Sequence, residues 1–326
     1  MVKDTTISNH KKILKREEKE SIECARGMWP SPSSSSHRPK AMSDAASTVS
    51  GFSVTSSVRH SQFAPGTPSS SSSPYGNQHK SVAETPPKTQ CSFGILVVGL
   101  GGANGTTMLA GVLANRLGIH WHGAKGEPMT PNYFGCITQL DSRGVHGGVG
   151  YRNIVKGLAD ANSAAIGGWD IRPTKPGDAL LQAQILDYDL VRQVQGEMNK
   201  VKLFRGLFDP RFIGSSQHDT AHHILTEEDA KNDSDALKCL RADIRYFKWK
   251  NGIVGHTTVI WSASVEPNSD LVTRIWTADQ LMKSIDMTEE ERGGPLPPSL
   301  LYATAAILEG CSFVNGGSQN TLACPG

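Results

Sequence analysis

The sequence predicts an α/β protein built on a doubly wound, Rossmann-like parallel sheet, and two observations carry this prediction. From about residue 91 onward, apolar runs suited to buried strands alternate with stretches of helical periodicity. Such alternation favours a parallel sheet with helices on both faces. In addition, a glycine-rich run at residues 99–107 (GLGGANGTT) separates the first strand from the first helix, where folds of this class bind their ligands.

Residues 1–90 have a different character. They are rich in Ser, Pro and Thr and contain serine tracts at residues 33–36 and 69–73. A segment with so few apolar side chains cannot offset the conformational entropy lost on folding. We therefore expect residues 1–90 to be a disordered tail, in which only residues 11–23 favour a short helix, and residues 91–326 to be the folded domain.

Composition narrows the functional classes. The net charge of +2 over 326 residues gives no global field that would attract nucleic acid. The chain has no apolar run near the ~20 residues that span a bilayer, and its N-terminus lacks the apolar core of a signal peptide. The six cysteines are scattered, which favours free thiols in a reducing compartment. We therefore expect a cytoplasmic protein without nucleic-acid or membrane partners.

The first predicted strand covers residues 93–98, which are almost wholly apolar. The helix that follows the glycine run is predicted over residues 108–117, because its apolar positions fall on one face. Gly118 then stands where a helix C-cap is expected.

In the middle of the chain, residues 133–140 and 164–171 are predicted as strands, with a glycine-rich loop at 144–150 between them. The apolar residues of 178–198 recur at helical spacing from Leu180 to Val194, which predicts one helix over that range.

Towards the end of the chain, a helix is predicted over residues 236–250, stopped by Asn251-Gly252. A β-branched, buried strand is expected at residues 256–264. Ser299 and Gly310 are the predicted N-cap and C-cap of a helix over 300–309. The last predicted strand, residues 311–315, runs into a polar turn at 316–321.

The glycine run matters because glycines let a backbone turn tightly and approach a pyrophosphate, which the N-terminus of the next helix then binds. The spacing departs from G-x-G-x-x-G, and the acidic residue expected about 20 positions later is missing. A glycine-rich turn without a ligand is therefore the alternative interpretation of this motif taken alone.

Polar segments at the ends of other predicted strands add to the glycine motif. Residues 101–106, Asp170, 262–264 and 315–320 all follow strands. The carboxyl ends of parallel strands meet at one edge of the sheet, where ligands bind. His218 and His222 have the i, i+4 spacing of metal ligands, but no carboxylate or cysteine accompanies them at ligand spacing, so we expect no metal site.

Several segments together resemble the myo-inositol-phosphate synthase family. Residues 99–107 are similar to its G-W-G-G-N-N-G-[ST]-T loop, and 132–139 to N-Y-F-G-S-[LIM]-T-Q. The resemblance continues in order along the chain with G-G-W-D-I at 167–171, F-D-P-R-F-I at 208–213 and F-V-N-G-G-S-Q-N-T at 313–321. It covers about residue 93 to the end.

This resemblance implies an NAD-dependent isomerase that converts D-glucose 6-phosphate to myo-inositol phosphate by oxidation, aldol cyclisation and reduction, in inositol and phospholipid biosynthesis. It also implies a homo-oligomer, a tetramer in the family, and a carboxylate, Asp170, that accepts hydrogen bonds from the adenosine ribose. The cofactor-binding residues that it implies are Gly99, Gly101, Gly102, Ala103, Asn104, Gly105, Asp170, Gln217, Ser262, Ala263, Ser264, Val265, Gly316 and Gly317.

The sequence also departs from the family pattern. Ala103 replaces the first Asn of the loop, Ser264 replaces the Asn of T-A-N-T, and Thr220 stands where an arginine is expected. The family's lysine-rich K-S-G-Q-T-K segment has no counterpart before Gly326. The resemblance therefore implies no catalytic residue here, and we expect this chain alone to be inactive or very weak, since such cations stabilise developing charge.

Two other functions remain open on the sequence. One is a generic NAD(P)-linked oxidoreductase, which would show net cofactor turnover with a sugar phosphate. The other is a non-catalytic NAD-binding or regulatory fragment, which would bind the dinucleotide without turnover.

Overall fold

The computed structural model describes residues 91–134, 136 and 157–325. The predicted tail at residues 1–90, its short helix, and the glycine-rich loop at 144–150 lie outside these residues. So does most of the strand predicted at 133–140, of which Tyr133 and Phe134 are not in a strand.

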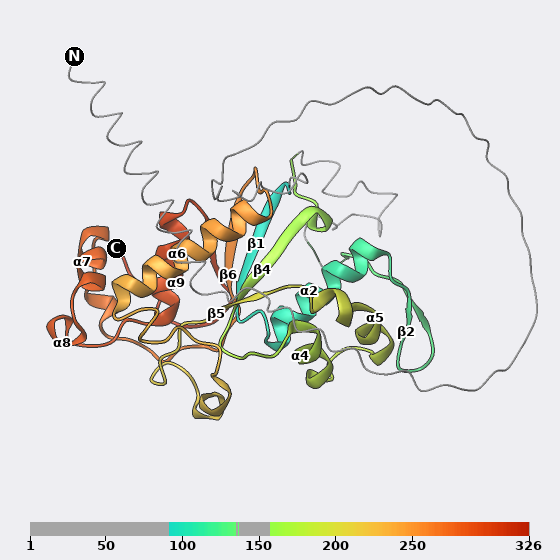
Figure 1. The fold of residues 1–326 in the computed structure, drawn as a ribbon, viewed down its shortest axis with the longest axis horizontal. Coiled ribbons are helices and arrows are strands. Elements are labelled where there is room, and N and C mark those ends of the chain that lie inside the picture. The colour runs from blue at the N-terminus through green and yellow to red at the C-terminus, as the bar shows by residue number, and fades with distance from the viewer. Residues whose placement is uncertain (1–90, 135, 137–156, 326) are drawn as a thin grey trace, which may run out of the picture. The chain divides into compact units, whose positions relative to one another are not determined.

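A five-stranded parallel sheet forms the centre of the described fold, as the sequence predicts (Figure 1). Its strand order is β5-β4-β1-β6-β7. The strands are β1 (Phe93–Val98), β4 (Ala164–Asp170), β5 (Leu203–Arg205), β6 (Thr257–Trp261) and β7 (Ser312–Asn315). Because the later strands add first to one side of β1 and then to the other, the loop after β1 lies where the strand order reverses.

The register brings the carboxyl ends of the three central strands level with one another. Val98 of β1 lies opposite Trp169 of β4 on one side and Trp261 of β6 on the other. The segments that follow these three strands therefore emerge together at one edge of the sheet.

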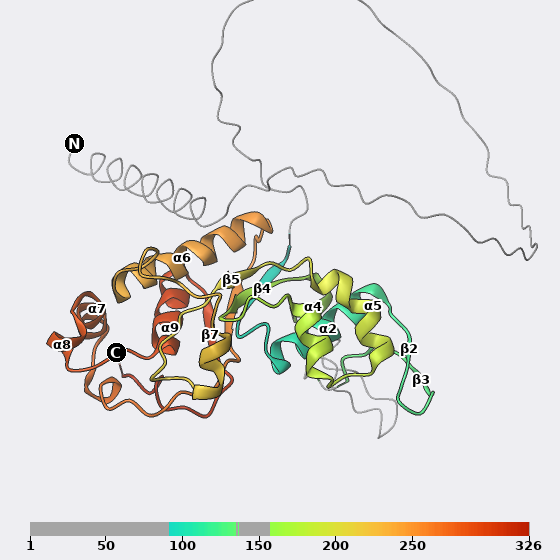
Figure 2. The same cartoon turned by 60° about the horizontal axis from the view of Figure 1, so that its bottom comes forward.

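Helices cover both faces of the sheet (Figures 1 and 2). On one face lie α2 (Ala103–Leu117), α4 (Pro176–Ala183) and α5 (Tyr188–Met198), and on the other α6 (Asp233–Lys250) and α9 (Pro298–Leu308). Successive residues of β1 point to opposite faces, so Leu96 packs into the core under α6 and α9, and Val97 into the core under α2 and α5.

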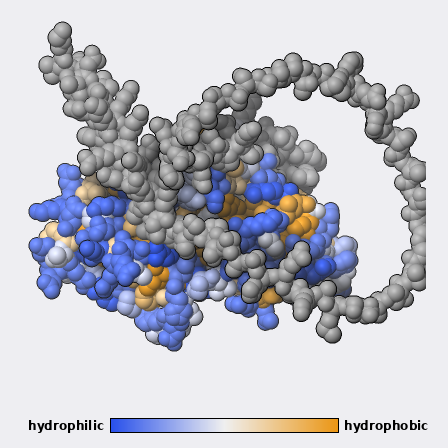
Figure 3. Space-filling view, in the orientation of Figure 1, coloured by the Kyte–Doolittle hydropathy of each residue, from blue (hydrophilic) through white to orange (hydrophobic). Residues whose placement is uncertain are grey.

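Shorter elements complete the described residues. The strands β2 (Trp121–His122) and β3 (Pro128–Met129) form a separate antiparallel pair, and α7 (Ala278–Asp286) and α8 (Glu289–Arg292) precede α9. Three 3₁₀ helices are η2 (Ala161–Ser163), η3 (Ser215–Thr220) and η4 (Val272–Arg274). The face seen in Figure 3 is largely hydrophilic, with small hydrophobic areas. No helix in the described part of the chain is long and apolar enough to cross a membrane.

The first helix begins earlier than predicted. It starts at Ala103 rather than at residue 108, because the turn closes within Gly99–Gly102, where the Gly102 N–H donates to the Gly99 carbonyl (2.9 Å). Its end is as predicted. Gly118 adopts the left-handed conformation (φ 60°) and its N–H donates to the carbonyls of Ala114 and Asn115.

The single helix predicted over residues 178–198 is wrong, because the structure has two helices there. The first ends at Ala183, and its C-cap, Gln184, has a left-handed backbone (φ 51°). The second begins after Asp187, whose carboxylate accepts a hydrogen bond from the Trp121 indole (2.9 Å). A hydrogen bond to β2, distant in sequence, thus lies at the break in an apolar pattern that reads as continuous.

Ser299 is not the N-cap that the sequence predicts. The helix begins at Pro298 with Pro297 as its N-cap, so Ser299 lies inside the first turn, where it is fully buried and donates to Glu266. At the other end, Glu309 is the C-cap, and Gly310 follows it with a φ of +66°. The strand predicted at residues 256–264 ends at Trp261, after which the chain turns into the site described below.

A buried carboxyl beneath the sheet makes stability depend on pH. Asp243 of α6 accepts a hydrogen bond from the Trp169 indole (2.8 Å). Burial raises the pKa of the Asp243 carboxyl to about 7, and the hydrogen bond offsets this rise only in part. An unfolded aspartate ionises near pH ~3.9. The folded chain therefore keeps a proton that the unfolded chain loses, and the free energy of unfolding falls as pH rises between these two values.

We expect Asp243→Asn to become more stable relative to the natural chain as pH rises from about 4 to about 7, because the amide cannot ionise. The difference should reach a few kcal/mol at most, since one pKa unit corresponds to about 1.4 kcal/mol. Urea unfolding of both proteins across this range measures it. A difference in unfolding free energy that does not change with pH would contradict the prediction.

Candidate dinucleotide-binding site

The turn after β1 is held by backbone hydrogen bonds to the end of β4. The N–H groups of Gly99 and Leu100 both donate to the carbonyl of Trp169, at 2.8 and 3.1 Å. Gly99 has a φ of +85°, and a Cβ there would lie 3.0 Å from the backbone of Ala263. A side chain at residue 99 is therefore disfavoured both by conformation and by space.

The start of α2 faces the site, and no side chain there competes with a ligand for the N–H groups of the first turn. Its N-cap, Gly102, supplies no capping side chain, and the first turn contains no acidic residue. The first N–H groups of a helix have no acceptor within the helix and carry the positive end of its dipole. Ala103 and Asn104 are exposed there, so this turn can receive an anionic group.

Asp170 ends β4 directly beside the turn and is only 3% exposed. Its Oδ2 accepts the Gly101 N–H (2.8 Å) and the Arg172 Nη2 (3.2 Å). Its Oδ1 accepts the backbone N–H (2.9 Å) and the Nε (3.0 Å) of Arg172. This carboxylate therefore ties the glycine turn to the segment that leaves β4.

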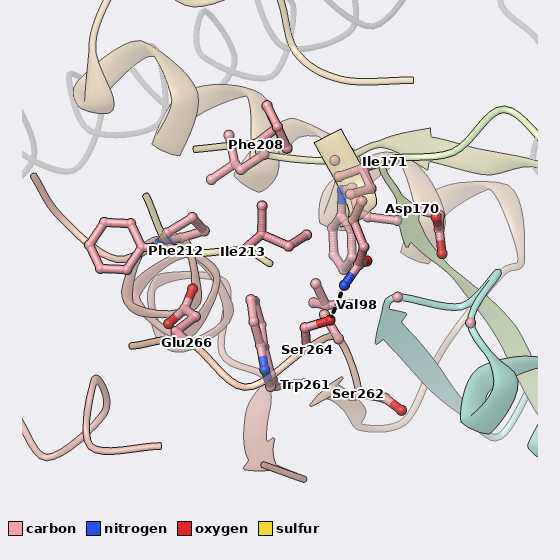
Figure 4. Close-up of a pocket in the computed structure, with 18 of the residues that line it drawn as sticks. Val98, Asp170, Ile171, Phe208, Phe212, Ile213, Trp261, Ser262, Ser264 and Glu266 are labelled. Atoms are coloured by element: carbon pink, nitrogen blue, oxygen red, sulfur yellow. Dashed lines mark hydrogen bonds between the residues drawn. The ribbon is translucent and has the colours of Figure 1, made fainter. Parts of the chain in front are cut away.

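The segment after β6 forms the next part of the site. The Ser262 N–H donates to the Val98 carbonyl at 3.0 Å, which keeps this segment against the end of β1. The Gln217 amide of η3 donates to the Ser264 hydroxyl at 2.6 Å, the bond drawn as a dashed line in Figure 4. Two residues implied by the family resemblance, far apart in sequence, are thus in contact.

Apolar and aromatic side chains form the remainder of the site. Phe208, Phe212 and Ile213 come from the segment after β5 and lie across the cavity from Asp170 and Ser262 (Figure 4). Tyr302 also lines the cavity, and its ring packs against Trp261 with ring centroids 6.0 Å apart. The Tyr302 hydroxyl accepts the Leu207 N–H (3.0 Å), and burial raises the pKa of that hydroxyl well above its usual range.

Glu266 is a buried carboxylate at the far end of the site. It accepts hydrogen bonds from the Ser299 backbone N–H (2.9 Å), the Ser299 hydroxyl and the Thr321 hydroxyl (2.8 Å). Burial raises the pKa of Glu266, and the Ser299 hydrogen bonds counteract this. The cluster joins the segment after β6, the first turn of α9 and the turn after β7.

These walls enclose a cavity of about 320 Å³. Its lining includes nine of the residues implied by the resemblance: Gly99, Gly102, Ala103, Asn104, Asp170, Gln217, Ser262, Ala263 and Ser264. The other five do not line the cavity: Gly101, Gly105, Val265, Gly316 and Gly317.

The five remaining residues have other positions. Gly101 binds Asp170, and Gly105 packs against Leu100 beneath the turn. Val265 is half exposed. Gly316 donates its N–H to the Trp261 carbonyl (2.9 Å), and Gly317 lies beyond it.

Sequence reasoning assigned no role to several cavity residues, namely Arg172, Phe208, Phe212, Ile213, Glu266 and Tyr302. Phe208, Phe212 and Ile213 belong to a recognised motif, which was the available signal. Arg172 follows Asp170 by two positions, and that short spacing was the signal for an ion pair. The burial of Tyr302 and Glu266 arises from tertiary packing and leaves no local signal.

Fold and site together define a dinucleotide-binding domain of the Rossmann class. The NAD-binding domain model described as myo-inositol-1-phosphate synthase matches residues 93–326. The chain therefore belongs to the myo-inositol-1-phosphate synthase family, and the cofactor that this match indicates is NAD.

Individual relatives agree with the family match. The chain is 36% identical over 238 residues to an inositol-3-phosphate synthase of Dictyostelium discoideum, covering 71% of this chain and 44% of that protein. It is 37% identical to inositol-3-phosphate synthase isozyme 1 of Arabidopsis thaliana, covering 71% of this chain and 44% of that one. The chain thus spans less than half the length of these relatives.

A solved structure is also similar. The crystal structure of inositol-3-phosphate synthase from Caenorhabditis elegans superposes with a TM-score of 0.64 at 31% identity, covering 72% of this chain and 46% of that one.

The residues present fit a dinucleotide. A Cβ at Gly102 would lie 3.1 Å from the Gly99 carbonyl, which is a tight contact, and 3.6 Å from the Arg172 Nη2. A side chain at residue 102, which lines the cavity, would therefore crowd the turn. The open backbone of the turn and the start of a helix suit the diphosphate of a dinucleotide. The aromatic walls of the cavity suit its rings.

The Glu266 cluster yields a prediction about stability. Glu266→Ala removes the acceptor of the buried donors of Ser299 and Thr321, and each unsatisfied buried donor costs about 1–3 kcal/mol. We expect a loss of about 3 kcal/mol in the free energy of unfolding, measured with urea. Glu228→Ala, at an exposed residue, is the matched control and should change stability by less than about 0.5 kcal/mol. Equal effects of the two substitutions would contradict a structural role for Glu266.

Proposed function

We propose that this chain provides the cofactor-binding part of an inositol-3-phosphate synthase, which converts D-glucose 6-phosphate to myo-inositol phosphate. The observation that carries the proposal is the cavity at the carboxyl edge of the sheet, where the glycine turn, Asp170 and residues 262–264 meet in a chain of this family. The printed names of the relatives support the reaction.

We propose that residues 91–326 form one NAD-binding domain, in which different residues bind different parts of the cofactor. The turn Gly99–Gly102 and the first residues of α2, up to Gly105, bind the pyrophosphate, and Asp170 lies at the adenosine ribose. Gln217 and residues 262–265 form the opposite wall, with Gly316 and Gly317 behind them. When bound, NAD supplies the hydride acceptor for the oxidation and the hydride donor for the final reduction.

The protein's own contribution in this proposal is positioning. The bonds from Gly99 and Leu100 to Trp169, and from Gly101 to Asp170, fix the turn before a ligand arrives. The Gln217–Ser264 hydrogen bond fixes the opposite wall. Phe208, Phe212 and Ile213 exclude water from that side of the cavity, which strengthens the electrostatic interactions inside it.

We also propose a cytoplasmic, homo-oligomeric enzyme that supplies inositol for phospholipid synthesis. The family resemblance supports the oligomer and the pathway. The compartment is supported by the dispersed cysteines, since the five that the structure describes are all free thiols.

The direct test is calorimetry with NAD⁺ on the full chain, together with an assay of glucose 6-phosphate turnover in the same preparation. Saturable NAD⁺ binding supports the proposal with or without turnover, because the proposal assigns the cofactor-binding part to this chain. Net NADH formation from the sugar phosphate would instead favour a generic oxidoreductase. Formation of inositol phosphate without net NADH would contradict the expectation that this chain alone is inactive or very weak, and absence of binding by folded protein would contradict the cofactor site.

A substitution in the turn tests where NAD binds. We expect Gly102→Val to lower NAD⁺ affinity at least about tenfold, because its side chain occupies the space beside the turn that the diphosphate needs. Gly111→Val is the matched control. It lies on the exposed side of the same helix, where a Cβ meets nothing within 4 Å, so NAD⁺ affinity should be unchanged. Calorimetry of both variants, with circular dichroism to verify folding, measures this, and equal affinities would contradict the assignment.

A further inference from the structure

Arg172 places a cation beside Asp170, at the end of the cavity where the proposed function puts the adenosine ribose, called the ribose end below. Its guanidinium lines the cavity, and its side chain is 36% exposed, whereas that of Asp170 beside it is only 2% exposed. A ligand that enters from the cavity therefore meets the guanidinium more readily than the carboxylate underneath.

The acceptor capacity of Asp170 is already used by the protein. A carboxylate offers about four lone-pair positions. Those of Asp170 receive the Gly101 N–H, the Arg172 backbone N–H, the Arg172 Nε and the Arg172 Nη2, all between 2.8 and 3.2 Å. Each Asp170 oxygen thus already accepts two hydrogen bonds, and the hydroxyl groups of an adenosine ribose, which act as donors to such a carboxylate in NAD-binding folds, have to compete with Arg172 for it.

Arg172 retains donor capacity of its own. A guanidinium carries five N–H donors, and the hydrogen bonds to Asp170 use one at Nε and one at Nη2. The Nη2 atom lies 3.6 Å from the position of a Cβ on Gly102, so the guanidinium lies next to the start of α2. That helix start has no acidic residue in its first turn and adds positive potential at the same place.

The other carboxylates of the cavity do not oppose an anion there. Asp209 is paired with Arg211 (2.7 Å), and Glu266 is held by Ser299 and Thr321 on the far side. The ribose end of the cavity is thus the region where a phosphate group meets unused arginine donors, which bind phosphate in a planar, two-pronged geometry.

We propose that Arg172 forms an anion subsite for a phosphate monoester on the adenosine ribose, so that this chain binds the 2′-phosphorylated dinucleotide NADP⁺ at least as tightly as NAD⁺. The inference rests on the proposed binding of a dinucleotide at the glycine turn and adds which form of it the chain selects. An arginine near the ribose accommodates the 2′-phosphate in folds of this class, whereas a free carboxylate selects NAD.

Calorimetry of the full chain with NAD⁺ and, separately, with NADP⁺ tests the proposal. For Arg172→Ala we expect NADP⁺ affinity to fall about tenfold or more, while NAD⁺ affinity stays the same or rises because Asp170 becomes available to the ribose. The ratio of the two dissociation constants is therefore the readout. Arg172→Lys keeps the positive charge but lacks the planar, two-pronged guanidinium, so it should give an intermediate ratio.

Arg192→Ala is the matched control, because Arg192 also forms an ion pair with a nearby aspartate (Asp189, 2.8 Å), but on the outer helix α5. Its ratio should equal that of the natural chain. A natural chain that binds NAD⁺ but not NADP⁺ would overturn the inference and leave the proposed function intact. An Arg172→Ala variant in which the affinities for NAD⁺ and NADP⁺ fall equally would also overturn the inference, because that result is expected if Arg172 has only a structural role. A folded natural chain that binds neither dinucleotide would overturn the proposed function itself.

Discussion

Three consecutive N–H groups of the glycine turn, those of Gly99, Leu100 and Gly101, bind two consecutive residues of β4, namely the Trp169 carbonyl and the Asp170 carboxylate. The position of everything else in the site follows from this contact. It sets the direction in which α2 leaves the sheet. It also holds in place the Asp170 carboxylate, to which Arg172 donates hydrogen bonds. Because β1 is paired with β4 and β6 in level register, the same contact brings the segment after β6 to the other side of the turn.

Much of this could be predicted from the sequence, because the signals are local. Apolar runs identify β1, β4 and β6, and the glycines between β1 and α2 identify the turn. The position of Asp170 directly after a buried strand was enough to place it at the carboxyl edge. The left-handed residue at the end of α2 also has a purely local cause, since glycine at position 118 adopts that conformation without steric cost.

What the sequence could not predict depends on contacts between distant segments. The break between α4 and α5 involves the Trp121 indole bound to Asp187, a pairing that helical periodicity does not reveal. Ser299 looks like an N-cap by its position after two prolines, yet Glu266 takes both its N–H and its hydroxyl into the interior. β5 is only three residues long and escapes any search for apolar runs. The ion pair of Arg172 with Asp170 leaves the guanidinium more exposed to the cavity than the carboxylate, although both residues are plain in the sequence.

The Glu266 cluster has a consequence for the order in which the site is completed during synthesis. A ribosome makes the chain from its N-terminus, so the glycine turn and Asp170 leave it long before Ser299 and Thr321. Until residue 321 has emerged, the Glu266 carboxylate lacks a partner that the finished fold supplies, and the far wall of the cavity is not fixed. The nascent chain can pair β1 with β4 early, since that contact is separated by about 70 residues, but it has to wait for the turn after β7 before the cavity is closed.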